Sequence, residues 1–335
     1  MSARRRPASG EFALIAQLAR ALAAPYAKAV ELGIGDDAAI LRVGKERVVV
    51  SVDDQVEGVH FDWRWLGPAD VGYRAVQAAA SDLAAMGATP LAAVASLHVP
   101  RGFSAAKLRQ LARGQAEAAR QLACPIVGGN VARGAVLSVT TTVLGRVAEP
   151  LLRSGARVGD ELWIIGELGL ARAGLLLHQR GSRVPARLRA VAERARRAWA
   201  RPEACVAAGR KLAGRAHALI DVSDGLAGDV QHLAQQSRVK AVLESAELAR
   251  LVSPELGELG ALLGEPGIAL VLAGGEDYAL LGAGPKSRRP PKARVVGRIE
   301  RGRGSELELE TGQRLRLGTG FDHLGKEARR RASRH

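Results

Sequence analysis

Five aspartates in the first quarter of the chain stand where an isolated negative charge is costly. Asp36 and Asp37 follow a Gly-Ile-Gly turn, Asp53 and Asp54 follow a β-branched run, and Asp82 lies in an alanine-rich helical pattern. Burying a carboxylate without a partner costs several kcal/mol, so a cation is expected beside them. Magnesium is the simplest candidate, because this small hard cation takes carboxylate oxygens and leaves positions free for substrate phosphates.

The elements that must position these acids can be predicted from the spacing of apolar residues. Residues 47–52 (RVVVSV) predict a buried strand that delivers the acidic pair 53–54 at its C-terminal end. Asp70 is a candidate N-cap for a helix that runs to about Met86. Asp82 shares the apolar stripe of that helix, so it needs a partner in the interior.

Aspartate is also common in turns and at helix N-termini, and this provides an alternative interpretation. For Asp36, Asp54 and Asp70 the two interpretations are equally open. For the other three acids the flanking apolar residues favour a metal-binding role. These are Asp37, Asp53 and Asp82.

Length and composition favour a globular protein of two domains. The 335 residues are 47% hydrophobic, with no apolar run as long as a membrane span, and we expect no signal peptide. We therefore expect a cytoplasmic protein with no membrane partner. Cys124 and Cys205 match no metal-binding spacing and are expected to be buried thiols.

The formal net charge of +15 raises the question of nucleic-acid binding. Most of the excess lies in arginine-rich segments of the C-terminal half, and charge runs are usually solvated faces. Only 3% of the residues are aromatic, and none interleave with the basic runs as a single-strand binder requires. We expect no nucleic-acid partner.

Strands and helices alternate along the chain, which predicts an α/β (α+β) fold in both halves. We expect an N-terminal domain that carries the magnesium-binding acids at 1–149 and a C-terminal α/β domain at 150–325. The basic tail 326–335 is expected to be disordered. Glycines in the segment 166–174 fit either a phosphate-binding helix entry or close packing of helix and strand.

A second group of polar residues follows a predicted strand at 217–222. It comprises Asp221, Ser223 and Asp224, and the sequence Gly-Gly-Glu-Asp-Tyr ends a later apolar stretch at 274–278. Phosphoryl transfer depends on positioning and charge neutralisation, so clustered acids that hold several magnesium ions can form most of its active site. The chain has no Walker loop, protein-kinase signature, zinc motif or G-x-S-x-G elbow.

Six short motifs together resemble the thiamine-monophosphate kinases, a family in the superfamily of aminoimidazole ribonucleotide synthetase. They are GIGDDAA, VEGVHF, SDLAAMGA, RSGARVGD, IDVSDGL and GGEDY. Each motif is weak alone, but all six occur in the family's order. The resemblance runs from Gly10 to His323, nearly the whole chain.

The resemblance implies direct in-line transfer of the γ-phosphoryl group of ATP to thiamine monophosphate, giving thiamine diphosphate. It also implies two α/β domains and a homodimer whose N-terminal domains pair into a barrel. The implied magnesium ligands are Asp37, Ser51, Asp53, Asp82, Asn130, Asp221 and Asp224, of which Asp53, Asp82 and Asp224 are the implied catalytic residues. The implied ATP contacts are Gly128, Gly129, Arg153 and Ser223, and the implied substrate contacts are His60, Glu276 and Phe321.

The three substrate contacts also have structural alternatives. His60 is also explained as a packed strand histidine, Phe321 as a core aromatic, and Glu276 as a turn cap.

Two positions depart from the family pattern. Val52 stands where the family usually has threonine, and Asn130 stands where it usually has aspartate. In the resemblance both positions serve the magnesium that Asp53 binds. Valine offers no side-chain ligand and an amide carries no charge, so we expect a slower kinase or one that needs more magnesium. The alternatives are a silent homologue that binds nucleotide or thiamine phosphates, and a superfamily member with another small substrate.

Overall fold

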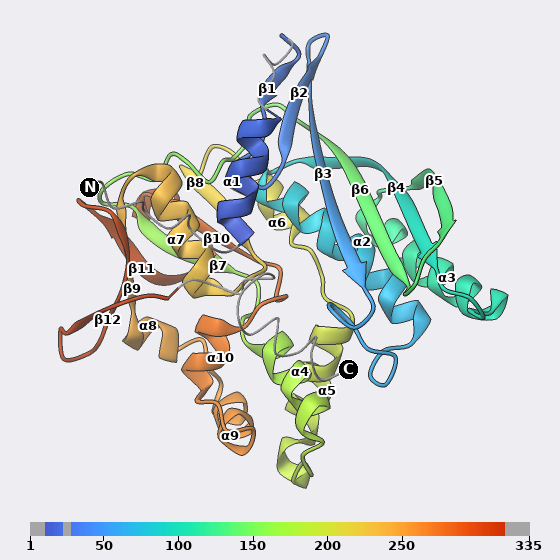
Figure 1. The fold of residues 1–335 in the computed structure, drawn as a ribbon. Coiled ribbons are helices and arrows are strands. Elements are labelled where there is room, and N and C mark those ends of the chain that lie inside the picture. The colour runs from blue at the N-terminus through green and yellow to red at the C-terminus, as the bar shows by residue number, and fades with distance from the viewer. Residues whose placement is uncertain (1–10, 23–27, 319–335) are drawn as a thin grey trace, which may run out of the picture.

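The computed structural model describes residues 11–22 and 28–318, arranged as two mixed layers of sheet and helix (Figure 1). In the N-terminal half the helices are α1 (Glu11–Ala21), α2 (Pro68–Ala85) and α3 (Ala105–Leu122). Its strands are β1 (Val30–Leu32), β2 (Ala39–Val43), β3 (Glu46–Val56), β4 (Thr89–Val99), β5 (Ile126–Arg133) and β6 (Ser138–Val147). They form one six-stranded sheet in the order β1-β2-β3-β6-β4-β5.

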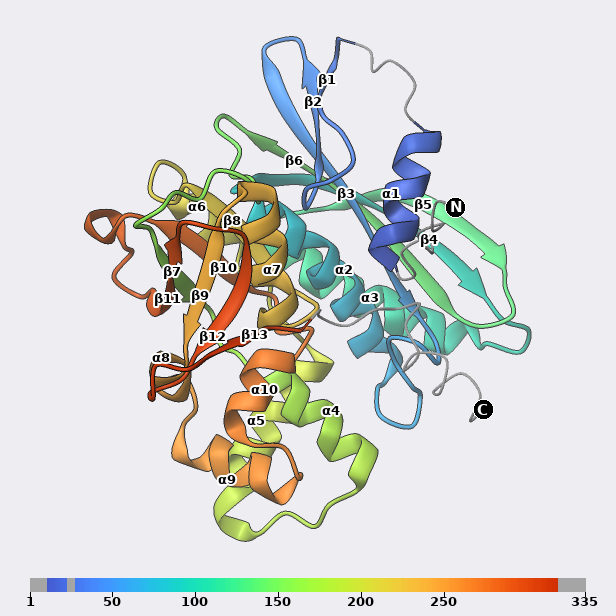
Figure 2. The same cartoon turned by 60° about the vertical axis from the view of Figure 1, so that its left-hand side comes forward.

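The C-terminal half contains a second sheet of seven strands, in the order β13-β12-β9-β11-β7-β10-β8. These strands are β7 (Glu161–Ile165), β8 (Ala218–Val222), β9 (Lys240–Glu244), β10 (Ala279–Gly284), β11 (Arg294–Glu300), β12 (Gly304–Glu308) and β13 (Arg314–Arg316). The helices are α4 (Leu170–Arg180), α5 (Arg189–Ala200), α6 (Val206–Leu212), α7 (Leu226–Ser237), α8 (Ser245–Ala249), α9 (Pro254–Leu262) and α10 (Gly267–Ala273). Figure 2 shows α4, α5, α9 and α10 grouped at one end of the molecule.

The expected two-domain α/β fold is confirmed, and α2 joins its two halves. One side of α2 packs on β3 and β6, and the other side packs on α6 and β8. Ala80, Ala84 and Ala85 of this helix share an apolar cluster with Trp163 of β7 and Leu219 of β8. The small alanine side chains allow a close approach, and a Cβ added at nearby glycine 209 would lie 2.0 Å from a backbone oxygen of α2. Helix α2 is thus buried between the two sheets.

Two predicted boundaries are wrong, each for a local reason. Strand β3 continues to Val56 because it pairs with β6 over its whole second half, so Asp53 lies within the strand instead of at its end. Helix α2 begins at Pro68 with Gly67 as N-cap, since proline is well suited to the first turn. Asp70 therefore lies in the first turn and is not the cap.

Within the described residues, helices α2 and α3 cover one side of the first sheet. Odd-numbered residues of β3 and β6 face α2, and Val49, Thr141 and Val143 are fully buried. Even-numbered residues face the other side, where Val52 is 59% exposed. Alternation of this kind is typical of a sheet with one packed face and one open face.

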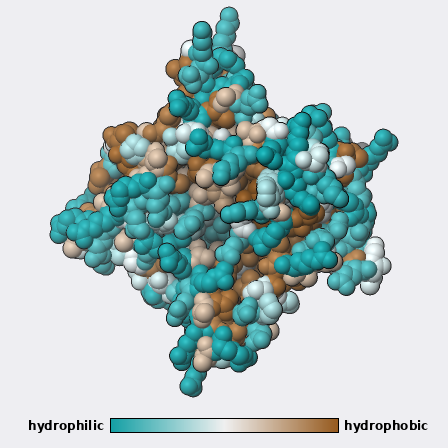
Figure 3. All heavy atoms as spheres, turned by 180° about the vertical axis from the view of Figure 1, so that it is seen from behind, coloured by the Kyte–Doolittle hydropathy of each residue, from teal (hydrophilic) through white to brown (hydrophobic). Residues whose placement is uncertain are grey.

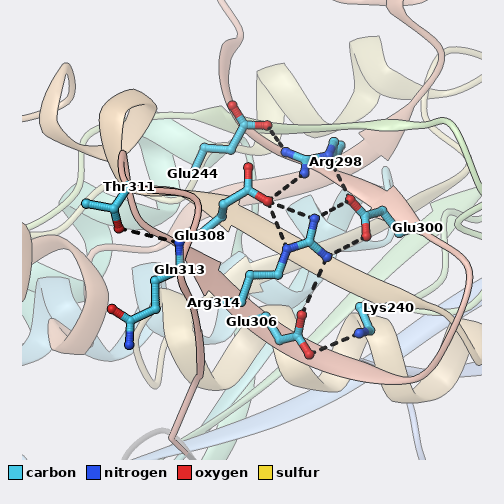
Figure 4. A network of polar contacts seen from close by, with 9 residues as sticks. All are labelled: Lys240, Glu244, Arg298, Glu300, Glu306, Glu308, Thr311, Gln313 and Arg314. Atoms are coloured by element: carbon cyan, nitrogen blue, oxygen red, sulfur yellow. Dashed lines mark hydrogen bonds and ion pairs between the residues drawn. The ribbon is translucent and has the colours of Figure 1, made fainter.

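Arginines of the second sheet are matched by glutamates (Figure 4). Arg298 contacts Glu244, Glu300 and Glu308, and Arg314 contacts Glu300 and Glu308 across neighbouring strands. These ion pairs offset the charges of Arg298 and Arg314 within the second sheet. Seen from behind, the surface is mostly hydrophilic with scattered apolar patches (Figure 3).

Within the described ranges no single helix has both the length and the apolar character of a membrane span. Helices α9 and α10 meet those criteria only as a pair, and the pair is bent by 88°.

Candidate active site

Three carboxylates from distant parts of the sequence meet where the two halves join. Asp37 lies in the turn before β2, Asp82 is in the last turns of α2, and Asp221 is near the end of β8. One oxygen of each lies within 4.8 Å of the others. We call these three residues the acid cluster. The structure thereby brings together three of the predicted metal ligands.

Each member of the acid cluster has a separate polar partner. Arg153 donates to Asp37 Oδ1 from Nη2 at 2.7 Å and from Nε at 3.1 Å. Ser51 Oγ donates to Asp82 Oδ2 at 2.5 Å, and Ser81 Oγ donates to Asp221 Oδ2 at 2.6 Å. These bonds orient the carboxylates, but only one full positive charge faces three negative ones.

Electrostatics in the acid cluster favour protonation when no cation is present. Burial raises the pKa of Asp221 to about 7, and repulsion from Asp37 adds to the shift. Burial also raises the pKa of Asp82, with further contributions from Asp221 and Asp37. Burial raises the pKa of Asp37 as well, although Arg153 opposes the change. A bound dication would remove this penalty.

The remaining acids of the first segment have different surroundings. Burial raises the pKa of Asp53 to about 6, and Asp53 lies on the same face of β3 as Ser51. Asp36 accepts hydrogen bonds from the backbone N–H groups of residues 37 and 153, as the turn interpretation requires. Asp54 is exposed on the open face and accepts a hydrogen bond from Thr140. Asp53 is therefore the acid best placed to extend the cluster.

Sequence reasoning missed a further buried acid, Asp229. It lies in the first turn of α7, is only 2% exposed, and its Oδ2 has no hydrogen-bond partner among the described residues. Burial raises its pKa, and the negative charges of Asp224 and Asp221 add to the shift. Its spacing from Asp224, five residues along the chain, was the available signal.

A cavity of about 1010 Å³ opens beside the acid cluster and continues between the two halves. Its lining includes the carboxylates of Asp53, Asp82, Asp221 and Asp224, together with Ser223. It also includes His60, Trp65, Trp199, Glu276 and Tyr278. The two groups adjoin, because the backbone N–H of Glu276 donates to the backbone oxygen of Ser223. The cavity therefore places carboxylates and aromatic rings around one space.

Two of the predicted substrate contacts line this cavity, whereas the third lies outside the described residues. His60 accepts a hydrogen bond from the backbone N–H of Val56 at Nδ1. Glu276 is 26% exposed, and both of its oxygens accept hydrogen bonds from protein donors. Phe321 falls beyond residue 318, where the described structure ends.

The predicted glycine-asparagine segment is not at this cavity. Gly128, Gly129 and Asn130 lie on β5, the outer strand of the sheet, and are exposed. In the sheet register Asp53 is opposite Thr141, Thr141 is opposite Ala95, and Ala95 is opposite Gly129. Three strand spacings of about 4.8 Å separate them by about 14 Å. One chain alone does not place Asn130 beside Asp53.

The glycines at 166–174 support the packing interpretation. The N–H groups of Gly169 and Ala171 at the start of α4 donate to the Asp277 carboxylate at 2.8 and 3.0 Å. A Cβ added at Gly174 would lie 2.1 Å from the backbone oxygen of Ala195, so α4 and α5 touch there. This helix entry is thus already occupied by a protein carboxylate.

The donor set of the acid cluster fits a hard dication. Its ligands are all oxygens, and Asp37 Oδ2 is buried without a hydrogen-bond partner in the described structure. An unpartnered buried carboxylate oxygen is costly unless a cation contacts it. Magnesium matches this chemistry better than zinc, which prefers sulfur and nitrogen ligands.

Family models and known relatives cover most of the chain. The AIR synthase related protein N-terminal domain matches residues 35–147, and the corresponding C-terminal domain matches residues 157–310. The thiamine-monophosphate kinase of Mycobacterium tuberculosis is 37% identical over 87% of this chain and 85% of its own length. The thiamine-monophosphate kinase of Aquifex aeolicus is 32% identical over 88% of this chain and 93% of its own length.

Solved structures agree with these relatives. A structure described as AaThiL complexed with AMPPCP and TMP superposes with a TM-score of 0.84 and 31% identity, covering 94% of this chain and 97% of that one. A thiamine-monophosphate kinase from Stenotrophomonas maltophilia is 34% identical with a TM-score of 0.71, covering 89% and 96%. With this sequence identity over most of both partners, the chain belongs to the thiamine-monophosphate kinase family.

Proposed function

We propose that the protein phosphorylates thiamine monophosphate with ATP to give thiamine diphosphate. The observation that carries this proposal is the cavity, whose wall combines a cluster of carboxylates with aromatic rings and an anchored glutamate. A phosphate group suits the carboxylates once cations are bound, and a ring system suits the aromatic residues. The relatives named above support the same reaction.

We assign the acid cluster, together with Ser51, Asp53 and Asp224, to magnesium. Bound magnesium would neutralise phosphate oxygens and stabilise the charge that develops during transfer. The protein's own contribution is to hold these carboxylates in place through Ser51, Ser81 and Arg153, and to keep the donor and acceptor phosphates in line. Asp53, Asp82 and Asp224 are the proposed catalytic residues.

We assign Ser223 and Arg153 to ATP, and His60, Glu276 and Phe321 to thiamine monophosphate. Ser223 lines the cavity together with the carboxylates, and Arg153 contacts Asp37 of the acid cluster. The proposed domain boundary lies between residues 149 and 150. The proposed location of the enzyme is the cytoplasm.

The proposed active form is a homodimer in which β5 of one subunit completes the site of the other. Gly128, Gly129 and Asn130 are exposed on an outer strand, next to Val127 and Val131, which are each 67% exposed. An unpaired edge with exposed valines favours association with another sheet. A second subunit would bring the segment 128–130 to the residues assigned to ATP. One chain alone does not bring them together.

The proposed reaction is tested with the purified full chain, ATP, thiamine monophosphate and a magnesium titration. Thiamine diphosphate, measured by chromatography, should form in proportion to enzyme and fall at least about 100-fold in Asp53→Asn, which keeps the size of the side chain but removes a metal charge. Absence of product at every magnesium concentration, with thiamine monophosphate still binding, would refute the kinase and leave the silent homologue. Product from another small phosphate acceptor alone would indicate a different superfamily substrate.

A further inference from the structure

Arg74 is a completely buried guanidinium between the two halves of the molecule. Its side chain is 0% exposed and lies in the middle of α2. An arginine remains charged in proteins, so such burial requires several hydrogen-bond partners. The partners come from three segments that are far apart in the sequence. Nε donates to Gln55 Oε1 on β3 at 2.9 Å, Nη1 donates to the backbone oxygen of Trp199, and Nη2 donates to Glu276 Oε1.

Glu276 is fixed by this arginine and by a second donor. Trp199 Nε1 donates to Glu276 Oε2 at 2.9 Å, and the Arg74 guanidinium lies over the Trp199 ring, 5.3 Å from its centroid. The backbone of Glu276 has a positive φ of 66°, and its N–H donates to the backbone oxygen of Ser223 at 2.8 Å. Both the backbone and the carboxylate of Glu276 are therefore held in one orientation at the cavity wall.

Helix α2 connects this glutamate to the acid cluster. Arg74, Ala78 and Asp82 are four residues apart and lie on one face of α2, opposite Gln55 and Ser51 on one face of β3. Eight residues of helix span about 12 Å, and four residues of strand span about 13 Å. The distance along α2 from Arg74 to Asp82 therefore matches the distance along β3 from Gln55 to Ser51. The Arg74 end meets Glu276, and the Asp82 end meets the acid cluster.

We propose that Arg74 is a positioning residue that orients Glu276 for the non-transferring part of the substrate and fixes its distance from the acid cluster. This inference rests on the proposed function. Pairing with Arg74 also compensates the charge of Glu276, so the glutamate acts as an oriented hydrogen-bond acceptor. Loss of Arg74 frees the glutamate and leaves its position undefined, while the acid cluster keeps its own partners.

The test compares Arg74→Met, Glu276→Gln and the double variant in the full chain. Thiamine monophosphate binding is measured by calorimetry, and KM is measured for both substrates. We expect KM for thiamine monophosphate to rise about 10- to 100-fold in each single variant, with the KM for ATP within about twofold of wild type. Because the two side chains act as one unit, the double variant should be no worse than the poorer single variant.

Two further variants separate positioning from folding. Trp199→Phe keeps an aromatic side chain but removes the indole N–H that donates to Glu276. It should therefore produce a smaller rise in the KM for thiamine monophosphate. Arg298→Met removes an arginine from the ion-pair network outside the cavity and should leave both KM values unchanged. If either single variant does not fold, the double variant, which contains no unpaired buried charge, and Trp199→Phe carry the test.

The outcomes distinguish this inference from the proposed function. A wild-type chain without thiamine diphosphate formation would refute the proposed function itself. An active wild type whose variants change both KM values equally, or whose single effects multiply in the double variant, would overturn the role of Arg74 alone.

Discussion

Replacing Asp82 with asparagine should stabilise the metal-free protein and destabilise the magnesium-bound one. Asparagine keeps the oxygen that accepts from Ser51 but removes one charge from the acid cluster. The oxygens of Asp82 and Asp221 lie within 4.8 Å of one another, where two unit charges at an effective dielectric constant of about 20 repel by about 3.5 kcal/mol. The charge of Asp37 adds less to this repulsion, because Arg153 forms an ion pair with it.

The size of the effect depends on pH in a direction set by the raised pKa values. A buried acid whose folded pKa is raised binds its proton more tightly in the folded state, so stability is greatest below the unfolded pKa of about 3.8. Stability is then lost as pH rises through the folded value, which is about 7 for Asp221. Asp82→Asn removes this loss, so its advantage should be smaller at pH 5, where only part of the loss has occurred, and full at pH 8.

The assay is thermal unfolding in chelator at pH 5 and pH 8, repeated with magnesium at pH 8. With an unfolding entropy of about 0.7 kcal/mol/K for a chain of this length, 3.5 kcal/mol corresponds to a rise in Tm of about 5 °C at pH 8. Magnesium should reverse the order of the two proteins. Glu310→Gln, an exposed change in a turn, is the control and should shift Tm by less than about 1 °C. An equal shift at both pH values, or a lower Tm in chelator at pH 8, would refute the reasoning.

Two further predictions concern the segments that one chain keeps apart. Asn130→Asp, combined with Val52→Thr on the open face of β3, should lower the magnesium concentration for half-maximal activity about two- to tenfold, since the negative charge expected at position 130 is restored; an unchanged concentration in the titration would contradict this. Gly128→Ala should raise the KM for ATP. It should leave Tm unchanged, because a Cβ there meets nothing within 4 Å. Gly129→Ala should lower Tm by several degrees, because its Cβ would lie 1.7 Å from the backbone oxygen of Ala95. Equal Tm values for the two alanine variants would argue against the described strand pairing.

The acids of the site were predictable because their neighbours are informative. Asp82 stands on an apolar stripe, and a carboxylate there required a polar or cationic partner, which the structure supplies as Ser51. Asp221 ends a strongly apolar strand, so its burial followed from the pattern. Local sequence was sufficient for these residues because burial is decided by the element that carries them.

The Arg74 network was not predictable in the same way. Its partners at 55, 199 and 276 are separated from it by up to 202 residues, and a lone arginine in an alanine-rich helix gives no local sign of its partners. The length of β3 was missed for a related reason. Its second half is polar and is retained in the sheet by pairing with β6, which is a tertiary effect.

The position of α2 between the two sheets limits how the molecule can move. Opening the halves like a hinge would expose the alanine face that packs on Trp163 and Leu219, and it would separate Arg74 from Glu276. Both changes cost free energy that ordinary domain closure does not require. Substrate entry and product release are therefore expected to proceed while the two halves stay in contact.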